Sequence, residues 1–184
     1  MITQVLGFRR DSDEYKVMGM SSYGKPNIDL SWLIKQTTNG YSLNESYLKK
    51  LNSSGSFLPT KQEPIYNKKI LKKINFNPST INDYNDTHYD FAASAQKTLN
   101  DIAVNLTKKL KKKFNSENLC IAGGVGLNCV MNQALLESKM FKNIFVQPAS
   151  SDSGTALGAA YLVSNDYGYK LNKYKLENVY LGNS

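Results

Sequence analysis

Histidine, cysteine and arginine are scarce in this sequence of 184 residues, which has one histidine, two cysteines and two arginines. Without a cluster of Cys and His, no zinc site built by this chain alone is expected. Cys120 and Cys129 are expected to be reduced and buried rather than joined in a disulfide. The sequence also lacks the run of about 20 apolar residues that spans a membrane and the apolar centre of a cleavable signal. These absences predict a cytoplasmic protein without a membrane partner.

Positive charge is the main bias of the composition, with a formal net charge of +8. The lysines concentrate in KKILKK (68–73) and KKLKKKF (108–114). Such runs lack the arginines that read base edges and are typical of solvated faces. We therefore expect no nucleic-acid partner.

The first part of the chain divides into two regions. Residues 1–26 are compact and end in the motif SSYGKP, whereas 27–85 are rich in Asn, Ser, Lys and Tyr with little sustained periodicity. Within the second region the pattern predicts a short helix over 30–36, a turn leading into a strand over 39–44, and loop over most of 52–67. Region 27–85 is thus expected to be a divergent, insertion-like segment or hairpin outside the core.

A long amphipathic helix is predicted after residue 88. Apolar residues recur at three- and four-residue steps from Phe91 to Phe114, which is the helical period. Asp90 is the expected N-cap or first-turn acid. The lysines at 108–113 fall at the C-terminal end, where the helix dipole favours positive charge.

Short strands and helices alternate in the rest of the core region, 86–164. The pattern predicts a strand at 119–122, a helix at 128–138, a second strand at 143–148 and a small-residue helix at 155–163. This order implies parallel strands joined by right-handed crossovers, and hence an α/β layered fold.

Both predicted strands end in glycine-containing turns that lead into helices. At the carboxyl edge of an open α/β sheet, such turns bind ligands. Gly123 and Gly124 remove the Cβ atoms that would hold a phosphate away from the backbone amides, and the next helix offers its positive end. Asn128 could add an amide contact to a ribose or phosphate. Tight strand-to-helix packing without any ligand explains the same glycines.

Asp152 lies at the tip of the second turn, just before Gly154. It could N-cap the following helix, with Ser153 or Thr155 as competitors for that role. Alternatively, it could be a carboxylate ligand for a metal held against the phosphates. One carboxylate cannot hold a catalytic metal by itself.

Four blocks of the sequence, taken together and in this order, resemble the O-carbamoyltransferase family of nodulation and antibiotic-tailoring enzymes. The resemblance covers nearly the whole chain, although the middle third matches poorly. The blocks are LGFRRDSDEYKVMGMSSYGKP (6–26), FAASAQ (91–96), NLCIAGGVGLNCVMN (118–132) and FVQPASSDSGTALGAAY (145–161).

The resemblance implies a fold and an activity. The fold is a partial domain, the C-terminal lobe of an actin- and sugar-kinase-like (ribonuclease H-like) transfer domain. Such a domain receives carbamoyl-adenylate, made from carbamoyl phosphate and ATP in a separate domain, and passes the carbamoyl group to a substrate hydroxyl.

The resemblance also implies site residues. Asp152 matches the metal-ligand aspartate of the family, for which iron is the expected metal, and Lys25 is a further candidate. An exposed Glu–Lys ion pair would explain Glu14 and Lys16 equally well. The implied nucleotide-binding residues are Gly123, Gly124, Val125, Asn128, Gly154, Glu14 and Lys16.

One departure limits what this chain is expected to do. The family holds its metal mainly with a His-x-x-x-His pair from the preceding lobe, whereas His88 is the only histidine here and is not expected to be a ligand. The chain is therefore expected to need a missing N-terminal lobe and an adenylate-forming domain, and to be inactive alone. The alternatives are a non-catalytic nucleotide-binding or partner-binding module and a purely structural sheet.

Overall fold

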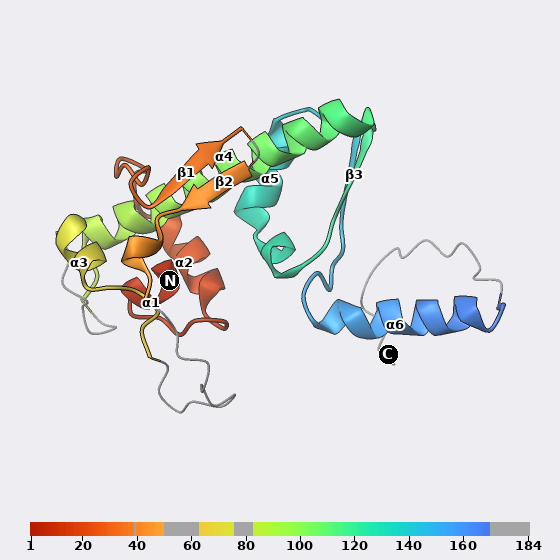
Figure 1. The fold of residues 1–184 in the computed structure, drawn as a ribbon, viewed down its shortest axis with the longest axis horizontal. Coiled ribbons are helices and arrows are strands. Elements are labelled where there is room, and N and C mark those ends of the chain that lie inside the picture. The colour runs from red at the N-terminus through yellow and green to blue at the C-terminus, as the bar shows by residue number, and fades with distance from the viewer. Residues whose placement is uncertain (39, 50–62, 76–82, 170–184) are drawn as a thin grey trace. The chain divides into compact units, whose positions relative to one another are not determined.

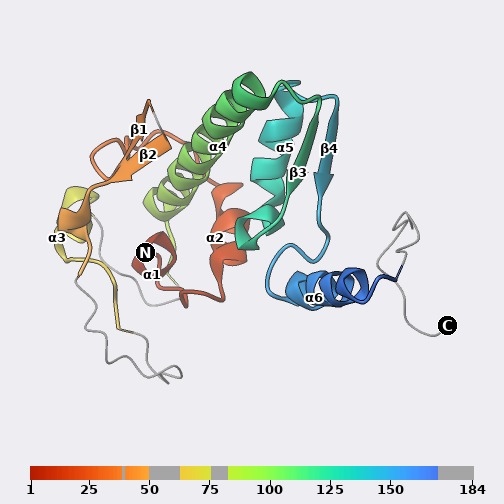
Figure 2. The same cartoon turned by 45° about the vertical axis from the view of Figure 1, so that its right-hand side comes forward.

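The computed structural model of the protein describes residues 1–38, 40–49, 63–75 and 83–169 (Figures 1 and 2). The chain divides into two units, Met1–Lys112 and Lys113–Ser184. The helices and strands in chain order are α1 (Ile2–Val5), α2 (Glu14–Ser21), β1 (Ile34–Thr37), β2 (Gly40–Leu43), the 3-10 helix η1 (Glu45–Tyr47), α3 (Lys69–Lys73), α4 (Asp86–Phe114), β3 (Asn118–Ile121), the 3-10 helix η2 (Gly124–Leu127), α5 (Cys129–Glu137), β4 (Asn143–Val146) and α6 (Ser153–Asp166).

The first unit has its own hydrophobic core, which gathers on the first turns of α4. Phe91 and Ala92 of that helix are completely buried. Complete burial of a large apolar side chain contributes about 1.5–3 kcal/mol, so these contacts hold α1, α2 and α3 to α4. The core consists of Val5, Leu6, Met20, Leu30, Leu33, Tyr66, Ile70, Ile74, Phe91 and Ala92.

The region 27–85 contributes to this core, so the prediction that it lies outside the core is wrong. Leu30 and Leu33 are buried at its start, and Ile70 of α3 is completely buried. The predicted hairpin is confirmed, because β1 and β2 pair antiparallel with Ile34 opposite Leu43. Much of the predicted loop at 52–67 lies outside the described residues.

The helix predicted over 30–36 is also wrong. The amides of Leu33 and Ile34 both donate to the Leu30 carbonyl, which makes a single turn, and β1 then begins at Ile34. The three-residue spacing of Leu30 and Leu33 matches a helix, but here it brings two side chains of one turn into the core. From Ile34 onward the chain is the strand β1, which pairs with β2.

Helix α4 begins at Asp86, one turn before the predicted start. The Asn85 side chain accepts a hydrogen bond from the Thr87 amide at 3.1 Å, and Nδ1 of His88 lies 3.2 Å from the Asn85 amide nitrogen and 2.7 Å from Oδ1 of Asn85. This reciprocal arrangement is a capping box with His in the place of Glu or Gln. Asp90 is therefore neither N-cap nor first-turn acid, and that prediction is wrong.

Asp90 instead holds the SSYGKP segment against α4. Its two carboxylate oxygens accept hydrogen bonds from the Lys25 amide and from Nδ2 of Asn27, each at 2.7 Å. These bonds, that of the Lys25 amide first, lower the pKa of Asp90. A Cβ at Gly24 would lie 2.1 Å from the backbone carbonyl of Tyr89, so only glycine permits this close approach.

The second unit confirms the predicted α/β order. Strands β3 and β4 are parallel, with Asn118 opposite Asn143 and Ile121 opposite Val146. Helix α4 ends at Phe114, after which Asn115 adopts a left-handed conformation that stops the helix. The predicted helices 128–138 and 155–163 correspond to α5 and to a longer α6.

Both cysteines are reduced, as predicted, but they are exposed rather than buried. Cys120 lies on the outward face of β3, where exposed and half-buried residues alternate, and Cys129 is the first residue of α5. Among the helices that the structure describes, none has both the length and the apolar character needed to span a bilayer.

Candidate functional site

The two glycine turns meet at the carboxyl ends of β3 and β4, as predicted. The Gln147 amide donates to the Ile121 carbonyl at 3.0 Å, which extends the ladder one residue past the end of β4. The Gly123 amide then donates to the Ser150 carbonyl at 2.6 Å, joining the two turns directly. Polar backbone from two sequence-distant segments is therefore gathered at one sheet edge.

Glycine is required at position 123 by the backbone itself. Gly123 has φ +99° and ψ 162°, a region that side chains other than glycine rarely adopt. A Cβ at Gly123 would meet no atom within 4 Å, and one at Gly124 would meet only Oγ of Ser151, at 3.7 Å. The outer side of the turn is therefore open, and both glycines leave room for a ligand.

Two backbone amides of this turn are available to a ligand. The Gly123 amide donates to the Ser150 carbonyl, and the Gly126 amide donates to the Gly123 carbonyl. Within the part of the chain that the structure describes, the amides of Gly124 and Val125 donate to no acceptor, and both residues are exposed. The turn thus presents two adjacent N–H groups, a common element of phosphate sites.

Two asparagines brace the turn from α5. Oδ1 of Asn128 accepts the Met131 amide at 2.8 Å and so caps the helix. Nδ2 of Asn132 donates to the Gly126 carbonyl at 2.8 Å. Oδ1 of Asn132 is buried and has no partner among the described residues. Asn132 was not predicted from the sequence, because it is the last residue of the block 118–132 and belongs to no recognisable pattern of its own.

Close packing explains the glycine of the second turn. A Cβ at Gly154 would lie 2.2 Å from the Ala149 carbonyl oxygen. The buried hydroxyl of Ser150 donates to the Gln147 carbonyl, and a Cβ at Gly126 would lie 2.9 Å from that hydroxyl. Ser150 is thus a central residue of the site that the sequence did not reveal, because only its neighbours carried recognisable signals.

Asp152 precedes α6, but its side chain makes no capping hydrogen bond. Its backbone carbonyl accepts the Thr155 amide and hydroxyl, so Thr155 does not cap the helix either. The Asp152 carboxylate is exposed. No group of three or more His, Cys, Asp or Glu side chains that could hold a metal occurs in the described ranges of the chain. These residues alone do not fit a metal centre.

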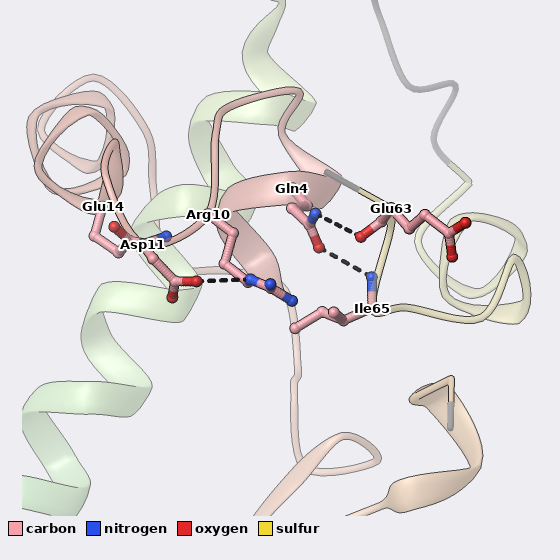
Figure 3. A network of polar contacts seen from close by, with 6 residues as sticks. All are labelled: Gln4, Arg10, Asp11, Glu14, Glu63 and Ile65. Carbon is pink, nitrogen blue, oxygen red and sulfur yellow. Dashed lines mark hydrogen bonds and ion pairs between the residues drawn. The ribbon is translucent and has the colours of Figure 1, made fainter. Parts of the chain in front are cut away.

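Glu14 and Lys16 lie in the first unit, and each is engaged by its own neighbours. Oε1 of Glu14 accepts the amide of Asp11 at 2.9 Å, and Asp11 pairs with Arg10 (Figure 3). Lys16 pairs with Asp13 at 3.0 Å, and this bond raises the pKa of Lys16. The anticipated Glu–Lys ion pair is thus an Asp–Lys pair. The glycine turns belong to the second unit.

Figure 3 also shows how the start of the chain is tied to residues 63–65. The side-chain amide of Gln4 donates to the Glu63 carbonyl at 3.1 Å and accepts the Ile65 amide at 3.0 Å. The Gln4 side chain therefore pairs with one backbone carbonyl and one backbone amide of this segment, as the backbone of a neighbouring strand would.

A family model described as "Carbamoyltransferase N-terminus" matches residues 1–161. The chain belongs to the carbamoyltransferase family. It is 34% identical over 170 residues to nodulation protein NolO of Bradyrhizobium diazoefficiens, covering 92% of this chain and 28% of NolO. Over 174 residues it is 34% identical to nodulation protein NolNO of Sinorhizobium fredii, covering 92% of this chain and 23% of that protein.

An uncharacterized protein of Methanocaldococcus jannaschii is 33% identical over 183 residues, which cover 99% of this chain and 27% of the archaeal protein. The chain spans about a quarter of the length of the curated relatives it matches. In these relatives, the matched region is accompanied by a much longer polypeptide.

Proposed function

We propose that this chain supplies the nucleotide-facing turns of an O-carbamoyltransferase, which transfers a carbamoyl group from carbamoyl-adenylate to a substrate hydroxyl. Membership of the family supports the transfer reaction. The observation that carries the site is the meeting of two glycine turns at the carboxyl ends of β3 and β4, with the Gly124 and Val125 amides open. The proposed fold of the complete domain is actin- and sugar-kinase-like.

In this proposal the chain binds and orients the phosphate of the nucleotide. The Gly124 and Val125 amides donate to phosphate oxygens, while Gly123 gives its amide to Ser150 and fixes the turn. Asn128 caps α5 and so holds the positive end of that helix near the turn. The acceptor hydroxyl then attacks the carbamoyl carbon, loses its proton, and AMP leaves with the bonding electron pair.

A metal belongs to the proposal only for the completed domain. When bound, iron would polarise the carbamoyl oxygen as a Lewis acid. Asp152 is an exposed carboxylate beside Gly154 and is the proposed contribution of this chain to that site. Without the partner ligands and a closed cleft that excludes water from the activated group, the isolated chain is expected to have little transferase activity.

Calorimetric titration with ATP tests the proposed nucleotide site. Gly124→Val should abolish the binding heat, because the new side chain occupies the space above the amides. The fold should tolerate the change, since a Cβ at position 124 makes only an ordinary contact. Gly158→Val is the matched control and should bind as the parent does, because position 158 lies in α6 in open space.

No heat from the parent chain at millimolar ATP would contradict the nucleotide site. Equal binding by the parent and Gly124→Val would show that the nucleotide lies elsewhere. Asp152→Asn should leave ATP binding unchanged and weaken metal binding only in a reconstituted enzyme.

A second candidate is a non-catalytic nucleotide-binding or partner-binding module. The lack of a metal-binding group in the described parts of the chain favours it. Reconstitution with the rest of a carbamoyltransferase, including the histidine pair, separates the two. Recovery of carbamoyl transfer supports the enzyme, and nucleotide binding without any recovered transfer supports the module.

A further inference from the structure

Helix α6 is apolar but has no buried residue. Its sequence, SGTALGAAYLVSND, places apolar residues on every side of the helix. Leu162 and Val163 are 67% and 55% exposed. A helix that is hydrophobic all round is normally buried, so α6 has the composition of a core helix and the exposure of a surface helix.

The β3–β4 sheet shows the same mismatch. The outward face carries Cys120 and Phe145, and Phe145 is 51% exposed. Parallel sheets occur almost only with both faces covered. In the described part of the second unit, the sheet has only these two strands, whereas sheets usually have four to six.

The surface of α6 also permits unusually close packing. Ala156, Ala159 and Ala160 are exposed together with Gly158, where an added Cβ would meet nothing within 4 Å. Small residues let the backbone of another element approach closely, and the larger Leu157 and Tyr161, 41% and 45% exposed, lie among them. The helix therefore has small residues that permit close approach of another backbone and large apolar side chains that contribute contact area.

We propose that two exposed apolar regions of the second unit, together called the open apolar surface, dock the remainder of a carbamoyltransferase polypeptide. The surface consists of Cys120 and Phe145 on the sheet and of Leu157, Tyr161, Leu162 and Val163 on α6. The length of the relatives supports this occupant, since they carry about three quarters of their chain beyond the matched region. Such a length suffices to add strands and a covering helical layer. The inference deepens the proposed function, on which it rests, by naming the docking surface of its partner.

Thiol reactivity of Cys120 measures this docking directly, because reaction with a thiol reagent follows exposure. In a Cys129→Ser background, Cys120 is the only thiol. Its modification rate is measured for the chain alone and after mixing with the remainder of NolO, expressed without its matching quarter and checked for folding by circular dichroism. The rate should fall about tenfold or more as Cys120 becomes buried in the complex.

Leu162→Glu should prevent this protection, whereas the matched control Leu43→Glu should not. Leu43 is 48% exposed on β2, outside the open apolar surface. The Leu162 variant should also bind less of a hydrophobic dye as an isolated chain. Both changes replace an exposed leucine, so neither is expected to unfold the protein.

Three results would overturn the proposal. Cys120 could stay fully reactive with the folded NolO remainder, both glutamate variants could behave alike, or the parent could form a dimer that Leu162→Glu dissociates. The last result would assign the surface to a second copy of the chain. ATP titration of the isolated chain is independent of docking, so failure here leaves the nucleotide proposal testable by itself.

Discussion

The two units of the chain bury their apolar residues to different degrees. In Met1–Lys112, α4 collects buried side chains from α1, α2, α3 and the turn before β1. In Lys113–Ser184, a parallel strand pair keeps an exposed outward face and α6 buries none of its residues. The first unit has the organisation of a self-supporting fold, whereas the second leaves much of its apolar surface exposed.

The largest expected difference comes from truncating one apolar side chain in each unit. Phe91→Ala should lower the free energy of unfolding by about 3–5 kcal/mol, because it leaves a cavity in the core. Leu162→Ala should change it by less than about 0.5 kcal/mol in the isolated chain, since the side chain is exposed. Urea unfolding of both variants measures the contrast. A large loss for Leu162→Ala would mean that α6 is already packed.

Two glycines of the second unit differ in how much room they leave for a side chain. Gly154→Ala should destabilise it by about 1–3 kcal/mol, because the new Cβ would clash with the Ala149 carbonyl. Gly158→Ala should stabilise α6 by up to about 1 kcal/mol, because its Cβ points into open space. Thermal unfolding by circular dichroism follows both. Equal effects would contradict the tight second turn.

A smaller effect is expected from pH in the first unit. Burial lowers the pKa of His88 below its ordinary value of 6.5, so the unfolded chain takes up the proton more readily. Stability should be complete above about pH 6.5 and should decline as the pH falls below it. His88→Gln keeps a capping-box acceptor but cannot titrate. It should therefore flatten the stability profile between about pH 5 and 7, and an unchanged profile would rule out His88 as the cause.

The smallest effect concerns a surface ion pair. Lys97 and Asp101, at i and i+4 on α4, pair at 2.6 Å with both side chains about half exposed. A double-mutant cycle with alanine should give a coupling of about 0.3–0.5 kcal/mol, decreasing in high salt. A coupling energy above about 1.5 kcal/mol would contradict this expectation, because so strong a coupling is typical of a buried ion pair.

Local patterns predicted the elements that depend on nearby residues. The periodicity of α4 and the strand–turn–helix order around Gly123 follow from the sequence alone. The same order also predicted that the two turns meet. The periodicity and the strand–turn–helix order are encoded along continuous stretches of chain, and the meeting of the turns follows from the parallel order of the strands.

Features that depend on distant partners were not predictable. Asp90 carries a typical first-turn signal, but it bonds Lys25 and Asn27, which lie 65 and 63 residues away. The need for glycine at 154 arises from the Ala149 carbonyl, and the composition of α6 does not reveal its exposure. The glycine signal at 123 was readable because the backbone conformation itself requires glycine there.

Amide NMR of the isotope-labelled chain during ATP addition tests most directly whether the glycine turns bind a nucleotide. We predict that the backbone signals of Gly124 and Val125 shift first and most, while those of α3 in the first unit stay in place. Unchanged turn signals at saturating ATP, or shifts confined to the first unit, would contradict the account.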